Sequence, residues 1–418
     1  MVTNIKQAII CVIGVGFVGL PLSNAFAGIH RVISFDIDQD KIRRLNQLNQ
    51  DPKHIFTNNP KAIAEADFIS ICVPTLLTKS KEPNMSYVEA AARIVGKNMK
   101  NGAIIILEST VYPGVTEEIV KPILEEESGL KCGESFEVAY SPERINPGDT
   151  EHTIEKVTKI VAANNIETLN IIADLYSEVA LNIYKAKSIK TAEAAKLVEN
   201  TQRDINIAFI NELSILFKKM DLNTNDVLEA ASTKWNFQRF SPGLVGGYCI
   251  PVVPYFFLYK AKELGYNPQI IQAGRSVNDK MSKYIVEIAI KSLNNAEKVI
   301  KHSKVLIMGL TYKENVEDTR ETPIRDLIKE LHEFDIEVFG FDPLVQNGES
   351  DFGIKFIKNL SDSNLMDCII LAVPHDVFKN VSLEQLKRIA NNRAIFIDIK
   401  GFYDTQQMKD SEFVYIRL

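Results

Sequence analysis

Short apolar runs alternate with stretches of helical periodicity through about the first 180 residues of the chain. Near-continuous apolar runs are typical of strands buried on both faces of a parallel sheet, and the stretches between them, such as 40–49 and 86–99, predict covering helices. The pattern therefore predicts a doubly wound α/β domain. Its predicted strands are 8–13, 32–36, 68–73, 103–108, 138–140 and 157–162.

The middle of the chain has a different pattern. No glycine or proline occurs from Asp149 through Ser241, and residues 188–220 keep helical periodicity throughout. Ser188 is a favourable N-cap residue, so this segment predicts one long helix, with a second helix at 224–231. We expect the long helix to span two domains or a subunit interface.

The last third returns to the α/β pattern, with predicted strands at 304–308, 337–341, 368–373 and 394–399 and a helix at 322–334. Gly309 and Asp342 lie at the ends of predicted strands as Gly14 and Asp36 do, but the spacing from glycine to aspartate is different, so the two regions are related architectures and not a short-period repeat. The predicted fold is α/β, with two Rossmann-like doubly wound domains joined by a long central helix. The predicted domains are 1–187, 188–295 and 296–418.

Composition narrows the function. The net charge of −6, from 48 basic and 54 acidic side chains, gives no reason to expect nucleic-acid binding. Five cysteines without C-x-x-C or zinc-ligand spacing favour a reducing, cytoplasmic compartment and no metal site. Residues 7–30 carry no charge, but Gly14, Gly16, Gly19 and Pro21 divide them into a strand, a turn and a helix. We therefore expect no membrane span.

The first turn carries a dinucleotide-binding pattern. Gly14, Gly16 and Gly19 follow a predicted strand and open a helix, which suits a pyrophosphate at the positive helix end. Asp36, at the end of the next strand, would accept hydrogen bonds from a ribose 2′-hydroxyl and repel a 2′-phosphate, so NAD is favoured over NADP. Lys41 could reach the same ribose or a phosphate, or it could be a solvated helix residue.

Cys249 lies in a loop, between Gly246-Gly247-Tyr248 and Ile250-Pro251. The glycines allow a sharp bend before it, so the thiol is expected on a loop and not on an apolar strand face. Either a nucleophile or a packed loop residue fits this pattern. The other four cysteines are interpreted as small apolar residues.

The long helix carries a polar stripe at Glu193, Lys196, Asn200 and Arg203. Such a stripe is either a solvated face or a buried catalytic face. A desolvated lysine there could act as a base or stabilise an oxyanion.

Together these residues resemble the UDP-sugar 6-dehydrogenases of the UDP-glucose/GDP-mannose dehydrogenase family, over essentially the whole chain. Within that family they are most similar to the UDP-N-acetylglucosamine and UDP-N-acetylgalactosamine 6-dehydrogenases of polysaccharide pathways. The motifs that carry the resemblance are 14–22, 108–110, 141–148, 196–200, 199–204, 234–237, 246–251, and Lys313 with Arg320.

The resemblance implies oxidation of a C6 alcohol to a carboxylate by two hydride transfers, with two NAD⁺, one water and no metal. It implies that Cys249 holds a thiohemiacetal and then a thioester, that Lys196 and Asn200 stabilise the oxyanion, and that Thr110 and Glu143 order the water. The NAD contacts implied are Gly14, Gly16, Phe17, Val18, Gly19, Asp36, Lys41, Thr75, Thr110 and Arg320. The UDP-sugar contacts implied are Glu143, Lys196, Asn200, Phe240, Gly246, Arg275, Lys313 and Lys400, in a homodimer or higher homo-oligomer.

Two positions depart from the family pattern. Val253 stands where an aspartate usually follows the cysteine by four residues, and Ser241 stands where the N-acetylhexosamine branch often has arginine, with Arg239 two positions earlier. The first departure leaves open a nucleotide-sugar-binding homologue with impaired catalysis. The second leaves open UDP-glucose or UDP-N-acetylmannosamine as the substrate.

Overall fold

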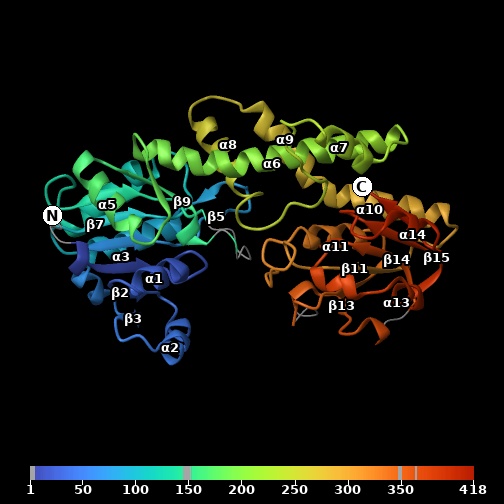
Figure 1. Cartoon of the computed structure of the whole chain (residues 1–418), viewed down its shortest axis with the longest axis horizontal. Helices are drawn as coiled ribbons and strands as arrows, with labels where there is room; N and C mark the ends of the chain where they lie inside the picture. The colour runs from blue at the N-terminus through green and yellow to red at the C-terminus, as the bar shows by residue number, and fades with distance from the viewer. Residues whose placement is uncertain (1–4, 145–150, 152, 347–350, 363–364) are drawn as a thin grey trace. The chain divides into compact units, whose positions relative to one another are not determined.

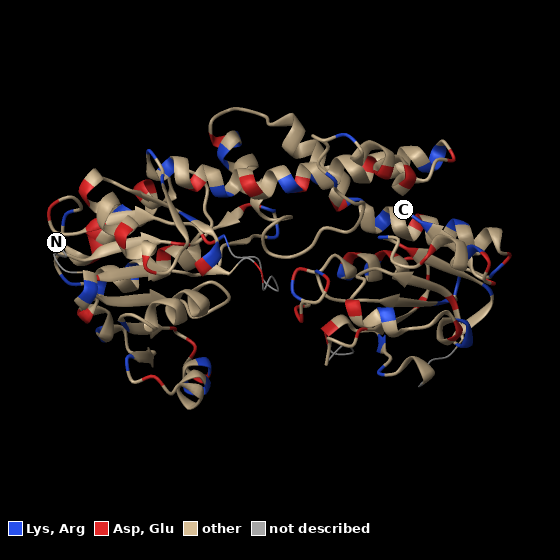
Figure 2. Cartoon of the chain, viewed as in Figure 1, with Lys and Arg blue, Asp and Glu red and all other residues tan. Residues whose placement is uncertain are grey.

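A computed structural model describes residues 5–144, 151, 153–346, 351–362 and 365–418. Its contacts divide the chain into two compact units (Figure 1). The first comprises Met1–Glu199 and Tyr255–Asn267, and the second comprises Asn200–Pro254 and Pro268–Leu418. Within the described residues, no helix is both long and apolar enough to cross a membrane. Basic and acidic residues are interspersed along the chain in both units (Figure 2).

The first unit contains an eight-stranded sheet in the order β10-β9-β8-β7-β4-β1-β2-β3. Six of its strands match the predicted apolar runs to within two residues at most ends, because they are buried on both faces. The strands are β1 (Ile9–Ile13), β2 (Arg31–Phe35), β3 (His54–Thr57), β4 (Phe68–Ile71), β7 (Ile104–Leu107), β8 (Glu137–Tyr140), β9 (Thr158–Ala163) and β10 (Asn182–Lys185).

The prediction of a wholly parallel sheet is wrong at one pair. Strand β9 runs antiparallel to β8, with Ala139 opposite Ala163 and Tyr140 opposite Ala162. Every other pair in this sheet for which a register is described is parallel. The reversal brings the first residues of β9 to the edge of the sheet where β8 ends.

Helices cover this sheet and pack on its apolar core. Buried helix residues such as Phe26 and Tyr176 form one apolar cluster with strand residues such as Ile10. The helices are α1 (Gly19–Ala27), α2 (Gln39–Leu48), α3 (Ser86–Asn98), α4 (Lys121–Ser128) and α5 (Ile166–Ser177), and a small hairpin is formed by β5 (Leu76–Leu77) and β6 (Pro83–Asn84).

The predicted long helix is present as α6 (Ile189–Lys219), which begins in the first unit and ends in the second. The Ser188 hydroxyl accepts a hydrogen bond from the Thr191 amide at 3.2 Å, as expected of an N-cap. Helix α7 (Thr224–Ser232) also lies where it was predicted. Three further helices precede the last third of the chain: α8 (Val253–Glu263), α9 (Gln269–Asp279) and α10 (Met281–Asn295).

The second unit contains a six-stranded parallel sheet in the order β13-β12-β11-β14-β15-β16. Its central strands form the core that the apolar runs predicted. The strands are β11 (Lys304–Met308), β12 (Glu337–Phe341), β13 (Lys355–Phe356), β14 (Met366–Leu371), β15 (Ala390–Asp398) and β16 (Val414–Arg417), and the helices are α11 (Ile324–His332), α13 (Leu383–Arg388) and α14 (Thr405–Lys409). The chain is therefore α/β, with two Rossmann-like domains.

Candidate active site

The turn between β1 and α1 has room for a ligand at one glycine only. Gly14 has φ of +90°, and a Cβ added there would lie 2.9 Å from the Cys72 carbonyl oxygen. A Cβ on Gly19 would lie 1.9 Å from the Gly14 oxygen, so both residues are needed for backbone packing. A Cβ on Gly16 would meet no atom within 4 Å. This open space, beside a helix start without a side-chain cap, fits the pyrophosphate of a dinucleotide.

Asp36 organises this turn. Its carboxylate is buried and accepts hydrogen bonds from the Val15 amide at 2.9 Å and the Asp38 amide at 2.9 Å. The Lys41 ammonium lies 2.7 Å from the same carboxylate, so Lys41 is held at Asp36 and is not a freely solvated helix residue. Phe17 is largely exposed at the start of α1, next to the half-buried Val18.

Two predicted threonines meet at the carboxyl edge of the sheet. Thr75 follows β4, Thr110 follows β7, and the Thr75 hydroxyl donates to the Thr110 carbonyl oxygen at 2.7 Å. Because ligands of open α/β sheets bind outside the carboxyl ends of the strands, this is the edge expected to hold NAD.

Lys196 and Glu143 are also brought together in the first unit. The Lys196 side chain is 8% exposed, and its ammonium donates to the Glu143 backbone carbonyl at 2.5 Å. The Glu143 carboxylate is itself buried and accepts from the Arg144 amide at 2.6 Å. Residues 145–148 of the predicted motif lie outside the described residues.

The polar stripe on α6 is buried only in part. Glu193 is fully buried and accepts hydrogen bonds from the Gly114 amide at 2.6 Å and the Thr116 amide at 2.9 Å, so it anchors a helical turn. Burial raises the pKa of Glu193, and these hydrogen bonds oppose that effect. Neither of the two expected alternatives, a solvated face or a buried catalytic face, describes the whole stripe, because Glu193 and Lys196 are buried and Arg203 is exposed.

Asn200, in the second unit, keeps an unused donor. Its amide nitrogen is buried and has no hydrogen-bond partner among the described residues. A buried donor without a partner costs free energy, so such a group is typical of a ligand site.

The Cys249 loop is seated on the segment that follows β11. A Cβ on Gly246 would lie 2.5 Å from the Pro323 ring, and one on Gly247 would lie 2.7 Å from the Tyr312 ring. The Gly247 amide donates to the Glu321 carbonyl at 2.9 Å, which fixes this bend.

The thiol of Cys249 is exposed, whereas Cys11, Cys72 and Cys368 are buried. Burial raises the pKa of those three thiols, which makes them poor nucleophiles. Val253 is 2% exposed and starts α8, and its amide donates to the Cys249 carbonyl at 3.0 Å. The residue one helical turn after the cysteine therefore contributes packing and no carboxylate.

Two other predicted residues of the second unit, Arg320 and Lys400, lie beside this loop or the segment that leads to it. The Arg320 guanidinium lies 5.1 Å from the centre of the Tyr248 ring and pairs with Asp318 at 2.8 Å. The Lys400 ammonium pairs with Glu314, and its side chain would lie 3.2 Å from a Cβ on Gly243. Phe240 is half-buried, and the Lys313 backbone carbonyl accepts from Thr311 at 2.8 Å.

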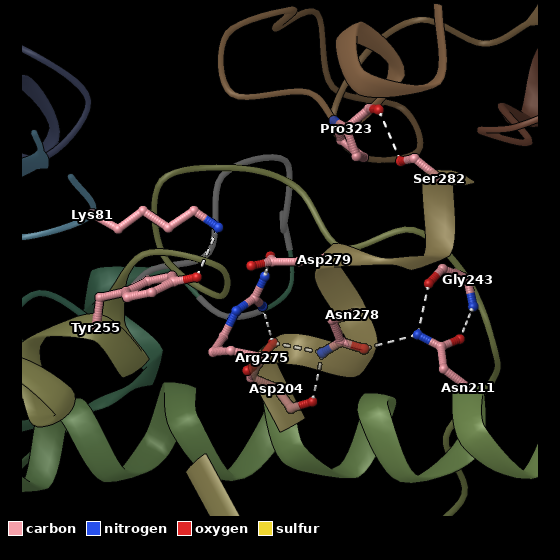
Figure 3. A network of polar contacts seen from close by, with 10 residues as sticks. All are labelled: Lys81, Asp204, Asn211, Gly243, Tyr255, Arg275, Asn278, Asp279, Ser282 and Pro323. Atoms are coloured by element: carbon pink, nitrogen blue, oxygen red, sulfur yellow. Dashed lines mark hydrogen bonds and ion pairs between the residues drawn. The ribbon is translucent and has the colours of Figure 1, made fainter. Parts of the chain in front are cut away.

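A buried network holds the chain that leads to Cys249, and sequence reasoning missed it (Figure 3). Asp204 on α6 accepts from Asn278 at 2.8 Å, and Asn278 in turn accepts from Asn211 at 2.8 Å. The Asn211 side chain binds both the amide and the carbonyl of Gly243, at 2.8 and 3.0 Å. Polar residues at these otherwise apolar helix positions were the available signal.

Arg275 belongs to the same network. It is 3% exposed and pairs with Asp204 at 2.5 Å and with Asp279. Burial raises the pKa of Asp204, with the Arg275 guanidinium opposing that rise. These ion pairs give Arg275 a structural role, and its contact with a sugar stays a prediction.

Comparison with known proteins agrees with this organisation. Residues 8–180, 190–280 and 306–405 match, in order, the NAD binding domain, the central domain and the UDP binding domain of the UDP-glucose/GDP-mannose dehydrogenase family. The chain is 42% identical over 417 residues to protein CapL of Staphylococcus aureus, which covers 96% of this chain and 98% of that protein. It is also 42% identical over 414 residues to a UDP-N-acetyl-D-glucosamine 6-dehydrogenase of Pseudomonas aeruginosa, with the same coverage.

A solved structure shares the fold over the whole chain. The UDP-D-ManNAc dehydrogenase of Pyrococcus horikoshii superimposes with a TM-score of 0.89 at 28% identity, covering 98% of each chain. The three matched domains and the full-length relatives lead to one assignment. The chain belongs to the UDP-glucose/GDP-mannose dehydrogenase family and is an NAD-dependent oxidoreductase.

Proposed function

We propose that the chain oxidises the C6 hydroxyl of a UDP-N-acetylhexosamine, UDP-GlcNAc or UDP-GalNAc, to the uronate. The observation that carries this proposal is the exposed Cys249 thiol on a loop seated on the UDP-binding domain. The full-length identity to a UDP-N-acetyl-D-glucosamine 6-dehydrogenase supports the substrate class. The balanced reaction converts one alcohol, one water and two NAD⁺ into one carboxylate, two NADH and three protons.

The first unit supplies the residues that would hold NAD. The Gly16 amide and the start of α1 would bind the pyrophosphate, Asp36 and Lys41 the ribose, and Thr75 with Thr110 the nicotinamide side. Bound NAD⁺ supplies a hydride acceptor. The protein's task is to keep the sugar carbon oriented and to exclude competing water.

Cys249 makes the second oxidation possible. Attack of its thiolate on the C6 aldehyde forms a C–S bond and a tetrahedral alkoxide, which can release a hydride as an aldehyde cannot. Loss of that hydride leaves a thioester, and water then cleaves the C–S bond to give the carboxylate and the free thiol. We assign Lys196 and Asn200 as donors to the oxyanion, because both present buried N–H groups from α6.

Thr110 and Glu143 are the proposed residues for thioester hydrolysis. Val253 has no carboxylate, so Glu143 is the carboxylate proposed to take a proton from the attacking water. A general base of this kind contributes about 10²- to 10⁴-fold to a rate.

The test is the stoichiometry of product and cofactor. Purified protein is incubated with UDP-GlcNAc, UDP-GalNAc, UDP-ManNAc or UDP-glucose, and both NADH and the nucleotide sugar are quantified. Two NADH per uronate are expected, with the highest kcat/KM for UDP-GlcNAc or UDP-GalNAc. One NADH with free aldehyde would overturn the cysteine mechanism, and a preference for UDP-glucose or UDP-ManNAc would overturn the substrate assignment.

The buried Val253 favours one alternative, a nucleotide-sugar-binding homologue that stalls as a thioester. Intact-protein mass spectrometry after addition of UDP-GlcNAc and NAD⁺ separates the two proposals. A persistent adduct on Cys249 without turnover supports the stalled form, and steady turnover without adduct excludes it. Val253→Asp should speed deacylation if the missing carboxylate is the cause.

We also propose that the protein is a homodimer or higher homo-oligomer. Phe209 and Leu216, two helical turns apart on α6, are 57% and 48% exposed, so one face of this helix offers two large apolar side chains that a second copy could cover. Light scattering should give a dimer or larger, and Phe209→Glu should reduce its mass towards that of the monomer. We further propose that this enzyme acts in the cytoplasm and that its product is a precursor for polysaccharide synthesis.

A further inference from the structure

Three residues of the first unit form a buried polar cluster that the proposed chemistry does not use. Glu108 follows β7, Lys159 lies on β9, and Tyr176 lies on α5, and all three are almost fully buried. The Lys159 ammonium lies 2.6 Å from one Glu108 oxygen, and the Tyr176 hydroxyl donates to the other. Lys159 also lies 5.4 Å from the centre of the Tyr176 ring. The ion pair with Glu108 and the contact with the Tyr176 ring therefore fix the position of the Lys159 ammonium.

The reversed direction of β9 puts this lysine at the carboxyl edge of the sheet. In the antiparallel pair with β8, Tyr140 lies opposite Ala162. Continuing that register beyond β8 brings Glu143 opposite Lys159. Side-chain contacts support the continuation, since Ser141 donates to the Ile160 carbonyl at 2.8 Å and Arg144 to the Thr158 carbonyl at 2.7 Å. A parallel β9 would have carried Lys159 to the opposite edge.

The ammonium of Lys159 therefore faces two carboxylates. It lies 3.5 Å from a Glu143 oxygen and 2.6 Å from a Glu108 oxygen. The Cys72 thiol also interacts with it, as does the Tyr176 ring, and Lys196 reaches Glu143 through the backbone carbonyl. Burial lowers the pKa of Lys159, but the two carboxylates outweigh that effect and raise it, so the lysine stays charged.

We propose that Lys159 is a positioning residue, which Glu108 and Tyr176 fix in place so that its charge orients the Glu143 carboxylate and keeps it ionised for water activation. This proposal rests on the proposed function, because it assigns Lys159 to the hydrolytic step. An ion pair with Glu108 alone would need no lysine within reach of Glu143. The contact at 3.5 Å and the strand reversal are the features that a merely structural pair leaves unexplained.

Two substitutions should shift the pH profile in opposite directions. Lys159→Met removes the cation beside Glu143, so the acid limb of the deacylation rate should move up by about 1 pH unit or more. Glu108→Gln removes a negative charge that acts on Glu143, while the new amide oxygen can still accept from Lys159, so the limb should move down. The rate is followed as decay of the Cys249 thioester by mass spectrometry. At pH 7 the Lys159→Met rate should fall by about 10²-fold, with an unchanged KM for UDP-GlcNAc.

Further variants keep the test independent of folding. Lys159→Met with Glu108→Gln leaves no unpaired charge of the buried pair, so this double variant should fold yet still hydrolyse the thioester slowly. Lys159→Arg should recover most of the rate. Lys100→Met, which removes an ion pair with Asp67 in the same unit at 2.6 Å, serves as the matched control and should leave the profile unchanged.

The outcomes separate the two proposals. If the wild-type protein fails to form two NADH per uronate, the proposed function is wrong. If it does so, and the folded single and double variants keep the wild-type pH profile and deacylation rate, the positioning role of Lys159 is wrong. Opposite shifts from Lys159→Met and Glu108→Gln support it.

Discussion

The turn after β1 in the first unit and the turn after β11 in the second unit are built alike. The Gly14 amide donates to the Phe35 carbonyl at 2.8 Å, and the Gly309 amide donates to the Phe341 carbonyl at 2.9 Å. Both glycines have positive φ, +90° and +84°. In each case an added Cβ would clash with a carbonyl oxygen just beyond the end of the neighbouring strand, that of Cys72 after β4 and that of Val373 after β14. The two Rossmann-like domains therefore close this turn by the same backbone contacts.

Aspartates occupy matching positions at both edges of the two sheets. Asp36 accepts from the Val15 amide at 2.9 Å as Asp342 accepts from the Leu310 amide at 2.6 Å. At the opposite edge, Asp67 accepts from the first residue of β1 at 2.8 Å, and Asp367 from the first residue of β11 at 3.0 Å.

The connection after the glycine is what distinguishes the two domains. In the first domain, helix α1 begins at Gly19, shortly after Gly14. In the second domain, a long loop follows Gly309 before α11 begins at Ile324. The first domain therefore offers a helix end, which suits a pyrophosphate. The second offers a long loop with Lys313 and Arg320, on which the Cys249 loop is seated. The NAD binding domain and the UDP binding domain therefore share a frame and differ in this connection.

The largest effect is expected from Cys249, which is seated on the second of these turns. Cys249→Ser should reduce NADH formation by about 10³-fold or more, since a hydroxyl is a far weaker nucleophile than a thiolate. Calorimetric binding of NAD⁺ and of UDP should be unchanged, because neither turn is altered. Cys132→Ser, at a half-buried cysteine of the first unit, is the control and should keep full activity. Retention of activity by Cys249→Ser would show that the chemistry does not use this loop.

The shared turn itself can be broken in each domain. Gly309→Ala should lower the free energy of unfolding by about 3 kcal/mol or more, because the added Cβ would lie 2.1 Å from the Val373 carbonyl oxygen. Gly14→Ala should lower it somewhat less, because its Cβ would lie 2.9 Å from the Cys72 carbonyl oxygen. Urea unfolding followed by circular dichroism measures both. Equal stability of either variant and the wild type would contradict the common role of the two glycines.

The sequence predicted those strands of the two domains that are buried on both faces and therefore form a run of apolar residues. The runs at 304–308 and 337–341 became β11 and β12 with the predicted bounds, because strands buried on both faces are continuously apolar. Strand β10 has mostly exposed residues, so it carries no such run. The direction of β9 was not predictable, since side chains alternate identically in either direction. Lys159 was missed for that reason.

The candidate site was predicted from short sequence motifs more than from the periodicity of apolar residues. The glycines, Asp36 and the Cys249 loop lie in the predicted elements, and Lys196 is buried. The network from Asp204 to Gly243 was not predicted, because it joins side chains distant in sequence through contacts that only the folded chain brings together.

A smaller effect is expected from a substitution at Gly16, which tests whether the turn between β1 and α1 binds NAD⁺ without disturbing the packing of that turn. Gly16→Ala should raise the KM for NAD⁺ by about tenfold without changing the melting temperature, because the added methyl group meets only open space in the protein. Gly28→Ala, at a position with ordinary φ after α1, is the matched control and should change neither quantity. An unaltered KM in Gly16→Ala would indicate that the pyrophosphate does not lie at this residue.

The smallest expected effect concerns the opposite edge of the second sheet. Burial pushes the pKa of Asp367 up, but bonds from the Lys304 amide, Asn391 and Lys298 outweigh it and hold that pKa below its ordinary 3.8. The ionised carboxylate therefore stabilises the fold at pH values above 3.8. This stabilisation is lost as the pH falls through the lower pKa that Asp367 has in the folded protein. Asp367→Asn should lower the free energy of unfolding by about 1 kcal/mol at pH 7, and by progressively less as the pH falls below the ordinary pKa of 3.8. Urea unfolding over a pH series tests this, with Glu412→Gln at an exposed position as control; a cost that grew with acidity would contradict it.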